Sequence, residues 1–180
     1  DSNTNPAPTV QDYIDAGITG VDAANLNAVN AKVDAVAKTD ADTVPEVQAL
    51  VDAGNITADT ALAKIANYAD SNTNPAPTVQ DYIDAGITGV DAANLNAVNA
   101  KVDAVAKTDA DTVPEVQALV DAGNITADTA LAKIANYADS NTNPAPTVQD
   151  YIDAGITGVD AANLNAVNAK VDAVAKTDAD

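Results

Sequence analysis

Apolar side chains recur at intervals of three and four residues along most of the chain, a spacing typical of helices that bury one face. In the first such stretch, Val10, Tyr13 and Ile14 share one face of a helix predicted over residues 9–16. A second helix is predicted to begin near Asp22, and its narrow apolar face consists of Leu26, Val29, Val33 and Val36. No stretch alternates apolar and polar residues as a half-buried strand does. The pattern therefore predicts an all-α fold.

Short polar residues indicate where these helices begin and end. Thr9 and Asp12 form a capping-box pattern at the start of the first helix, and Gly17 supplies the left-handed residue that commonly follows a helix. A second capping box, Thr43 and Glu46, opens a third helix. The predicted inward-facing residues of that helix are Val44, Val47, Leu50 and Val51.

Gly54 is predicted to end the third helix, because glycine is the residue most often found just beyond a helix C-terminus. Thr57 is then predicted to cap a fourth helix, which buries Leu62, Ile65 and Tyr68. The first 69 residues are thus expected to form two short helical pairs.

An identical internal repeat organises the chain. Residues 1–8 return unchanged as residues 70–77 and 139–146, which gives a period of 69 residues. The repeats are residues 1–69, residues 70–138, and a partial third copy at residues 139–180 that holds only the first helical pair. Within a repeat, the second pair echoes the first more weakly. Identical copies disfavour an enzyme, because a catalytic site needs one distinct, tuned environment.

Two all-α architectures are compatible with the repeat. In the first, tandem short helical hairpins stack as an elongated αα repeat rod, and stacking buries apolar area that a small alanine-rich repeat cannot bury alone. In the alternative, a string of small helical bundles is joined by the proline-containing segment 70–77. Because the third copy stops part-way, the chain is expected to be a piece of a longer array, either natural or built from a consensus.

Charge and composition exclude several classes of function. The chain has 27 acidic residues against 8 lysines, no arginine, and a net charge of −19. Nucleic acids and anionic membrane surfaces would repel it, and no apolar run approaches the ~18 residues of a membrane span. The absence of Cys and His removes disulfides, thiolate chemistry and the commonest zinc ligand. We therefore expect no enzyme, no nucleic-acid partner and no membrane insertion.

Acidic clusters at the joints between helices match calcium loops in part. Residues 70, 72, 74 and 81 stand at positions 1, 3, 5 and 12 of an EF-hand-like loop, but Pro75 replaces the glycine of position 6. The same residue types cap turns and helices, so capping and calcium binding both remain open. The calcium candidates are Asp70, Asn72, Asn74 and Asp81; their copies Asp139, Asn141, Asn143 and Asp150; Asp40, Asp42 and Glu46; and Asp109, Asp111 and Glu115. No other cofactor is expected.

The run PTVQDYIDAGITGV at residues 8–21, followed by NLNAVN at residues 25–30, resembles the Ala/Asp-rich helical tandem repeats of giant bacterial surface adhesins. Through the repeats, the resemblance covers essentially the whole chain. It implies an extracellular spacer or stalk at the bacterial cell surface, of the kind found in biofilm adhesins, that holds a distal adhesive domain away from the cell. The expected partners are neighbouring repeats in the same, monomeric chain, and the ligand of the adhesive domain is not identified.

A shorter resemblance points to a different class of function. The AGIT turn at residues 16–19 and its flanks are similar to GA-type three-helix modules of Gram-positive surface proteins. This similarity implies the alternative that the helices bind a host protein directly. The small Ala, Asn and Asp side chains on the predicted outer faces favour the spacer.

Overall fold

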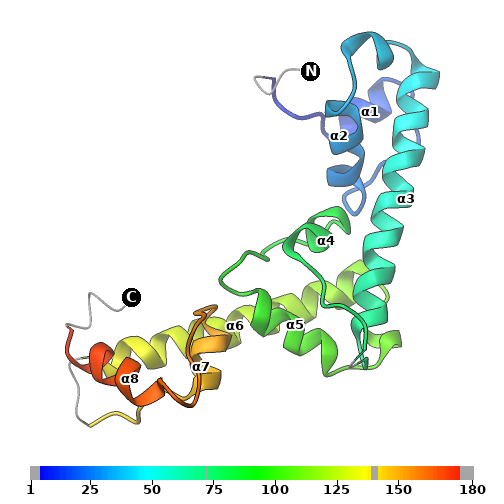
Figure 1. Ribbon diagram of the computed structural model, residues 1–180. Coiled ribbons are helices and arrows are strands. Elements are labelled where there is room, and N and C mark those ends of the chain that lie inside the picture. Colours follow the sequence, from blue (N-terminus) through cyan, green and yellow to red (C-terminus); the bar gives the residue numbers. More distant parts are fainter. Residues whose placement is uncertain (1–4, 72, 139–141, 175–180) are drawn as a thin grey trace. The chain divides into compact units, whose positions relative to one another are not determined.

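All regular elements in the described part of the chain are helical. The computed structural model describes residues 5–71, 73–138 and 142–174, and it contains no strand in these ranges (Figure 1). The all-α prediction is therefore confirmed.

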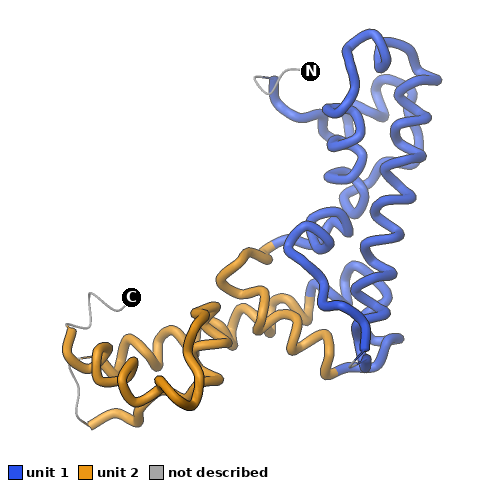
Figure 2. Tube along the Cα trace, viewed as in Figure 1, with its two compact units in different colours: residues 1–88, 105–117 blue, residues 89–104, 118–180 orange. Residues whose placement is uncertain are grey.

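The chain forms two compact units. Unit 1 comprises residues 1–88 and 105–117, and unit 2 comprises residues 89–104 and 118–180 (Figure 2). For the sequence repeats we use separate names: the A halves are residues 1–42, 70–111 and 139–180, and the B halves are residues 43–69 and 112–138. The second A half contributes to both units.

Each A half contains two short helices, and each B half is one long helix. In the A halves lie α1 Val10–Asp15, α2 Leu26–Asp34, the 3₁₀-helix η1 Lys38–Asp40, α4 Val79–Asp84, α5 Leu95–Asp103, the 3₁₀-helix η2 Lys107–Asp109, α7 Val148–Asp153 and α8 Leu164–Asp172. In the B halves lie α3 Val44–Tyr68 and α6 Val113–Tyr137, each of 25 residues.

The predicted caps of α1 are confirmed. The backbone N–H of Asp12 donates to the Thr9 hydroxyl at 3.3 Å, and Asp12 Oδ2 accepts from the Thr9 N–H at 2.8 Å. Gly17 follows the helix with φ +78, the left-handed region that a side chain would strain. The predicted inner face was partly wrong: Tyr13 is buried, but Ile14 is 56 % exposed, so α1 buries a narrower stripe than its apolar residues suggest.

The predicted break at Gly54 is wrong, because α3 continues through it (Figure 1). Thr57 does not cap a new helix; its hydroxyl donates to the carbonyl of Ala53, one turn back. Gly54 is buried where α2 crosses α3, and a Cβ there would lie 2.7 Å from Cα of Val29. Glycine is required by this close approach of two helices, and the tertiary contact overrides its local tendency to end a helix.

Two amides of α3 fasten the loop between α1 and α2. The Gln48 side chain accepts from the Thr19 N–H at 3.1 Å and donates to the Thr19 carbonyl at 3.0 Å. Two turns further along the helix, Asn55 accepts from Asn25 at 2.7 Å and donates to the Gly20 carbonyl at 3.2 Å. Gln48 and Asn55 therefore hold the loop against α3 at Thr19, Gly20 and Asn25.

The core of the first repeat lies under this loop. Tyr13, Ile18, Val29 and Val51 form a buried cluster. The Tyr13 hydroxyl donates to Asn30 Oδ1 at 2.7 Å, so the one polar group that enters the cluster with the ring is satisfied.

Replacing Gly54 by Ala should destabilise the chain, although alanine is the better helix former by about 1 kcal/mol. The added Cβ would displace α2, and overpacking of this kind costs about 1–3 kcal/mol. Urea unfolding measures the change. As a control, Ala63→Gly at an exposed position of α3 should cost only the propensity difference of about 1 kcal/mol. A Gly54→Ala chain that is more stable than the parent would contradict the close approach.

Because the nearest atoms to the added Cβ include the backbone N and Cα of Val29, trimming that side chain should not rescue the variant. The double variant Gly54→Ala/Val29→Ala should be less stable than Gly54→Ala alone. Recovery in the double variant would place the conflict in the valine side chain.

Candidate functional site

The B-half helix is longer than its own A half requires. Within unit 1, α3 packs first against α2 and then, along its C-terminal part, against α4 and η2 of the next repeat (Figure 1). The buried residues of this C-terminal part are Ala58, Ala61, Ile65 and Ala66. Three of the four are alanines, which let helices approach closely. We call this contact between a B-half helix and the following A half the repeat junction.

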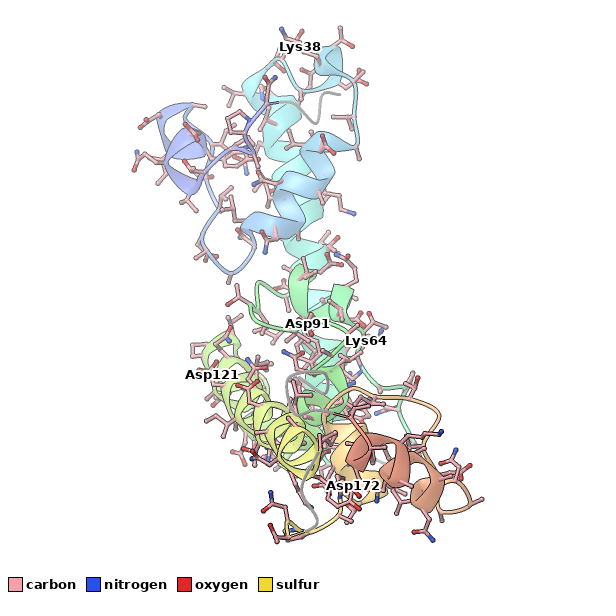
Figure 3. The ribbon with its side chains drawn as sticks, turned by 90° about the vertical axis from the view of Figure 1, so that its left-hand side faces the viewer. Lys38, Lys64, Asp91, Asp121 and Asp172 are labelled. Atoms are coloured by element: carbon pink, nitrogen blue, oxygen red, sulfur yellow. The ribbon has the colours of Figure 1, made fainter. Side chains whose placement is uncertain are left out.

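An ion pair crosses the repeat junction. Lys64 Nζ of α3, labelled in Figure 3, lies 2.5 Å from Asp81 Oδ2 of α4, and the Asp81 side chain is only 18 % exposed. The same oxygen accepts from the Thr78 N–H and hydroxyl, both at 2.7 Å. Burial alone would raise the pKa of Asp81, but the hydrogen bonds from Lys64 and Thr78 outweigh it and lower the pKa. The charged carboxylate is thus the form that the junction stabilises.

The ion pair recurs in unit 2. Lys133 Nζ of α6 lies 2.5 Å from Asp150 Oδ2 of α7. Burial would raise the pKa of Asp150, but the hydrogen bonds from Lys133 and Thr147 outweigh it and lower the pKa. Two copies of one sequence therefore form the same contact in two separate units.

Near the end of α3, Asn67 holds two segments of the next A half. Its carbonyl accepts from Asn74 Nδ2 at 2.5 Å, and its side-chain oxygen accepts from Lys107 Nζ at 2.6 Å. In unit 2, Asn143 donates to the Asn136 carbonyl at 2.5 Å. The proline-containing segment that links the repeats is therefore tied back onto the helix that precedes it.

A second glycine, Gly86, is required where the backbones of two successive A halves approach closely at the junction. Gly86, after α4, has φ +74, and a Cβ on it would lie 2.1 Å from the carbonyl oxygen of Ala24. Gly155 meets Ala93 in unit 2 in the same way, at 2.2 Å. Any side chain at this position would push the two A halves apart.

Four of the calcium candidates give side-chain oxygens to other partners. Asp81 and Asp150 serve the ion pairs, and Glu46 and Glu115 accept from Thr43 and Thr112 in capping boxes. In the described part of the chain, no three acidic side chains converge in a way that could hold a metal ion.

The remaining calcium candidates lie at loops and helix ends. Asp40 and Asp109 end the 3₁₀-helices, and Asp42 and Asp111 are exposed. Asp70 has φ +53 just after α3, a conformation that aspartate tolerates better than most residues. Asn74 and Asn143 donate to the preceding helices, while Asn72, Asp139 and Asn141 lie outside the described residues.

Sequence reasoning missed the lysines and Asn67 as junction residues. Each full repeat has three lysines, and copies of two of them, Lys64 and Lys107, bind across the first junction. In a chain with 27 acidic residues, the scarcity of lysines was the sequence feature that could have indicated these contacts.

Among the described helices, none is both long and apolar enough to span a bilayer.

Comparison with known proteins found no relative of this chain. No family model, no curated protein and no solved structure matches the chain.

Asp81→Asn should destabilise the chain more than Asp12→Asn does. Both changes alter the same capping box, but only Asp81 faces a lysine, so the difference isolates the ion pair. Since Lys64 is 38 % exposed and the pair is screened, we expect a difference of about 0.5–1 kcal/mol in the free energy of unfolding. Equal losses in the two variants would contradict a stabilising ion pair.

The pH dependence follows from the lowered pKa of Asp81. The carboxylate stabilises the fold at pH values above its ordinary pKa of 3.8, and this contribution is lost as the pH falls through the lowered folded-state pKa. Urea unfolding at a series of acidic pH values should therefore show a steeper loss of stability for the parent than for Asp81→Asn.

Calcium binding at the joints stays a prediction of the sequence, and thermal melting in millimolar calcium tests it. Binding should raise the melting temperature, and the rise should disappear in the double variant Asp81→Asn/Asp150→Asn. Magnesium at the same concentration controls for ionic strength. An unchanged melting temperature in calcium would contradict the prediction.

Proposed function

We propose that the chain is a structural spacer, a stalk segment of a large bacterial surface adhesin, whose repeats stack into an elongated array outside the cell. The observation that carries the proposal is the recurrence of one repeat junction: the same lysine–aspartate pair, at 2.5 Å, joins repeat 1 to repeat 2 and repeat 2 to repeat 3. A protein whose task is length needs such a contact, formed again by every added copy.

The division of the B-half helix supports the same proposal. Its N-terminal part is fixed to its own A half by Gln48 and Asn55, and its C-terminal part is fixed to the next A half by Lys64 and Asn67. One helix therefore belongs to two successive A halves, so the step from one repeat to the next does not depend on a free linker.

Charge and side-chain size also suit a spacer. The net charge of −19 is spread over all three copies of the repeat, and mutual repulsion keeps such arrays soluble and apart. A spacer needs no catalytic residue, and the repeat supplies the same side chains in each copy.

Small-angle X-ray scattering on chains of two, three, four and six repeats tests the spacer. The maximum dimension should rise by a fixed step for each added repeat, because every new junction repeats the previous one. Growth that is weak and close to a square root of repeat number would contradict the proposal and favour a string of independent bundles.

A matched set of chains with Ala85→Arg at every junction is the control. Ala85 is 2 % exposed, so an arginine there should block junction packing while leaving each separate A half intact. These chains should lengthen less per repeat than the parent set.

A further inference from the structure

One face of the first repeat, formed by its A half and by Val47 near the start of α3, is more exposed than the identical face of the second repeat. Since the sequences are the same, the difference measures what a neighbouring repeat covers. Four pairs of copies show it within unit 1, with the exposed or half-buried member first: Pro8 and Pro77, Ala16 and Ala85, Ala41 and Ala110, and Val47 and Val116. All four second members are buried, with Ala110 and Val116 at 0 % exposure.

Two hollows open on this face of the first repeat. One, of about 920 Å³, is lined by Asn5, Val33, Lys38 and Ala41 among others. A second, of about 360 Å³, is lined by Asp12, Ala16, Ala41 and Val47 among others. Both hollows are lined by Pro8, Val33 and Ala41, so they adjoin, and we call the two together the N-terminal groove.

The second A half identifies what fits the groove. There the counterparts of Asn5 and Lys38 are Asn74 and Lys107, and both donate to Asn67 near the end of α3. Two residues that line the groove in the first copy thus have counterparts that receive a B-half helix in the second.

Charge and shape agree with this occupant. Asp12, the copy of Asp81, has its carboxylate on Thr9 and faces the groove, so a lysine at the position of Lys64 would complete the ion pair. A Cβ on Gly17 would meet nothing within 4 Å, whereas one on its copy Gly86 would collide with Ala24 of the preceding repeat. Space is therefore free where the neighbour belongs.

We propose that the N-terminal groove is a docking surface for a helix with the sequence of residues 57–69, supplied by another copy of the repeat. Both copies of that helix in this chain already hold an A half, through Lys64 and Lys133. The occupant therefore comes from outside residues 1–180. The inference rests on the repeat junction of the proposed spacer function, and it adds a defined binding face on the first A half.

The test places residues 42–69 ahead of Asp1 in the full chain. Because residues 1–8 and 70–77 are identical, this addition recreates the natural junction, and the covalent link gives the helix a high effective concentration. Isotope labelling of residues 1–42 alone separates their signals from those of the identical copies. Amide hydrogen exchange at Tyr13 and Ile18, whose N–H groups donate to Thr9 and Tyr13 carbonyls, should slow by about tenfold or more.

Two variants test whether the added helix acts through the groove. An extension in which the equivalent of Ile65 is Asp should give no slowing, because that side chain is 0 % exposed in the existing junction. Ala16→Arg in the extended chain should also abolish the slowing. In the chain without the extension, Ala16→Arg should leave the melting temperature unchanged, since Ala16 is exposed there.

Three results would overturn the proposal. These are an unchanged exchange rate in the extended chain, the same slowing with the Ile65→Asp extension, and slowing that survives Ala16→Arg. Sedimentation of the unextended chain tests a different occupant: a dimer that Ala16→Arg abolishes, together with no effect of the extension, would assign the groove to a whole second chain instead. If the exchange rate is unchanged while longer arrays still lengthen by a fixed step, the docking proposal falls and the spacer proposal stands.

Discussion

The structure depends on one unbroken helix that serves two A halves. The N-terminal part of α3 approaches α2 so closely that only glycine fits at position 54, and its C-terminal part carries the lysine that binds Asp81 of the next repeat. If the helix ended at Gly54, the two contacts would belong to separate elements and the second would no longer be positioned by the first. Continuity through this glycine therefore couples the fold of one repeat to its attachment to the next.

The sequence predicted correctly those features that depend on residues close together along the chain. The capping boxes at Thr9 and Thr43 use bonds between residues three apart, so the sequence alone contains both partners. The role of Gly54 depends on Val29, a residue on another helix, and no local rule reveals that pair. Ile14 is a similar case: its position on the helix suggests burial, but no neighbouring element covers it, and it stays 56 % exposed.

The ion pair between Lys64 and Asp81 at the repeat junction was not predicted, because its two residues lie on different helices. Sequence reasoning gave attention to the acidic residues because they are abundant, and it found calcium-like spacing that includes Asp81. In the structure that carboxylate is occupied by Thr78 and by a lysine from the preceding repeat. Asp81 therefore has two roles, one local and predictable, the other dependent on the next element in space. In a chain with such an excess of acid, the scarce lysines indicate where specific contacts form.

Three copies of one aspartate have the same local sequence but differ in the contacts that they make with neighbouring repeats. Asp12, Asp81 and Asp150 all accept from the threonine three residues before them, and the pKa of each is lowered. Only the second and third are also covered by a preceding helix and paired with its lysine. Because the local sequence is the same in all three, the difference comes from the neighbour. A repeat of this kind is therefore stabilised in part by its position in the array, and an uncovered first copy lacks contacts that every covered copy has.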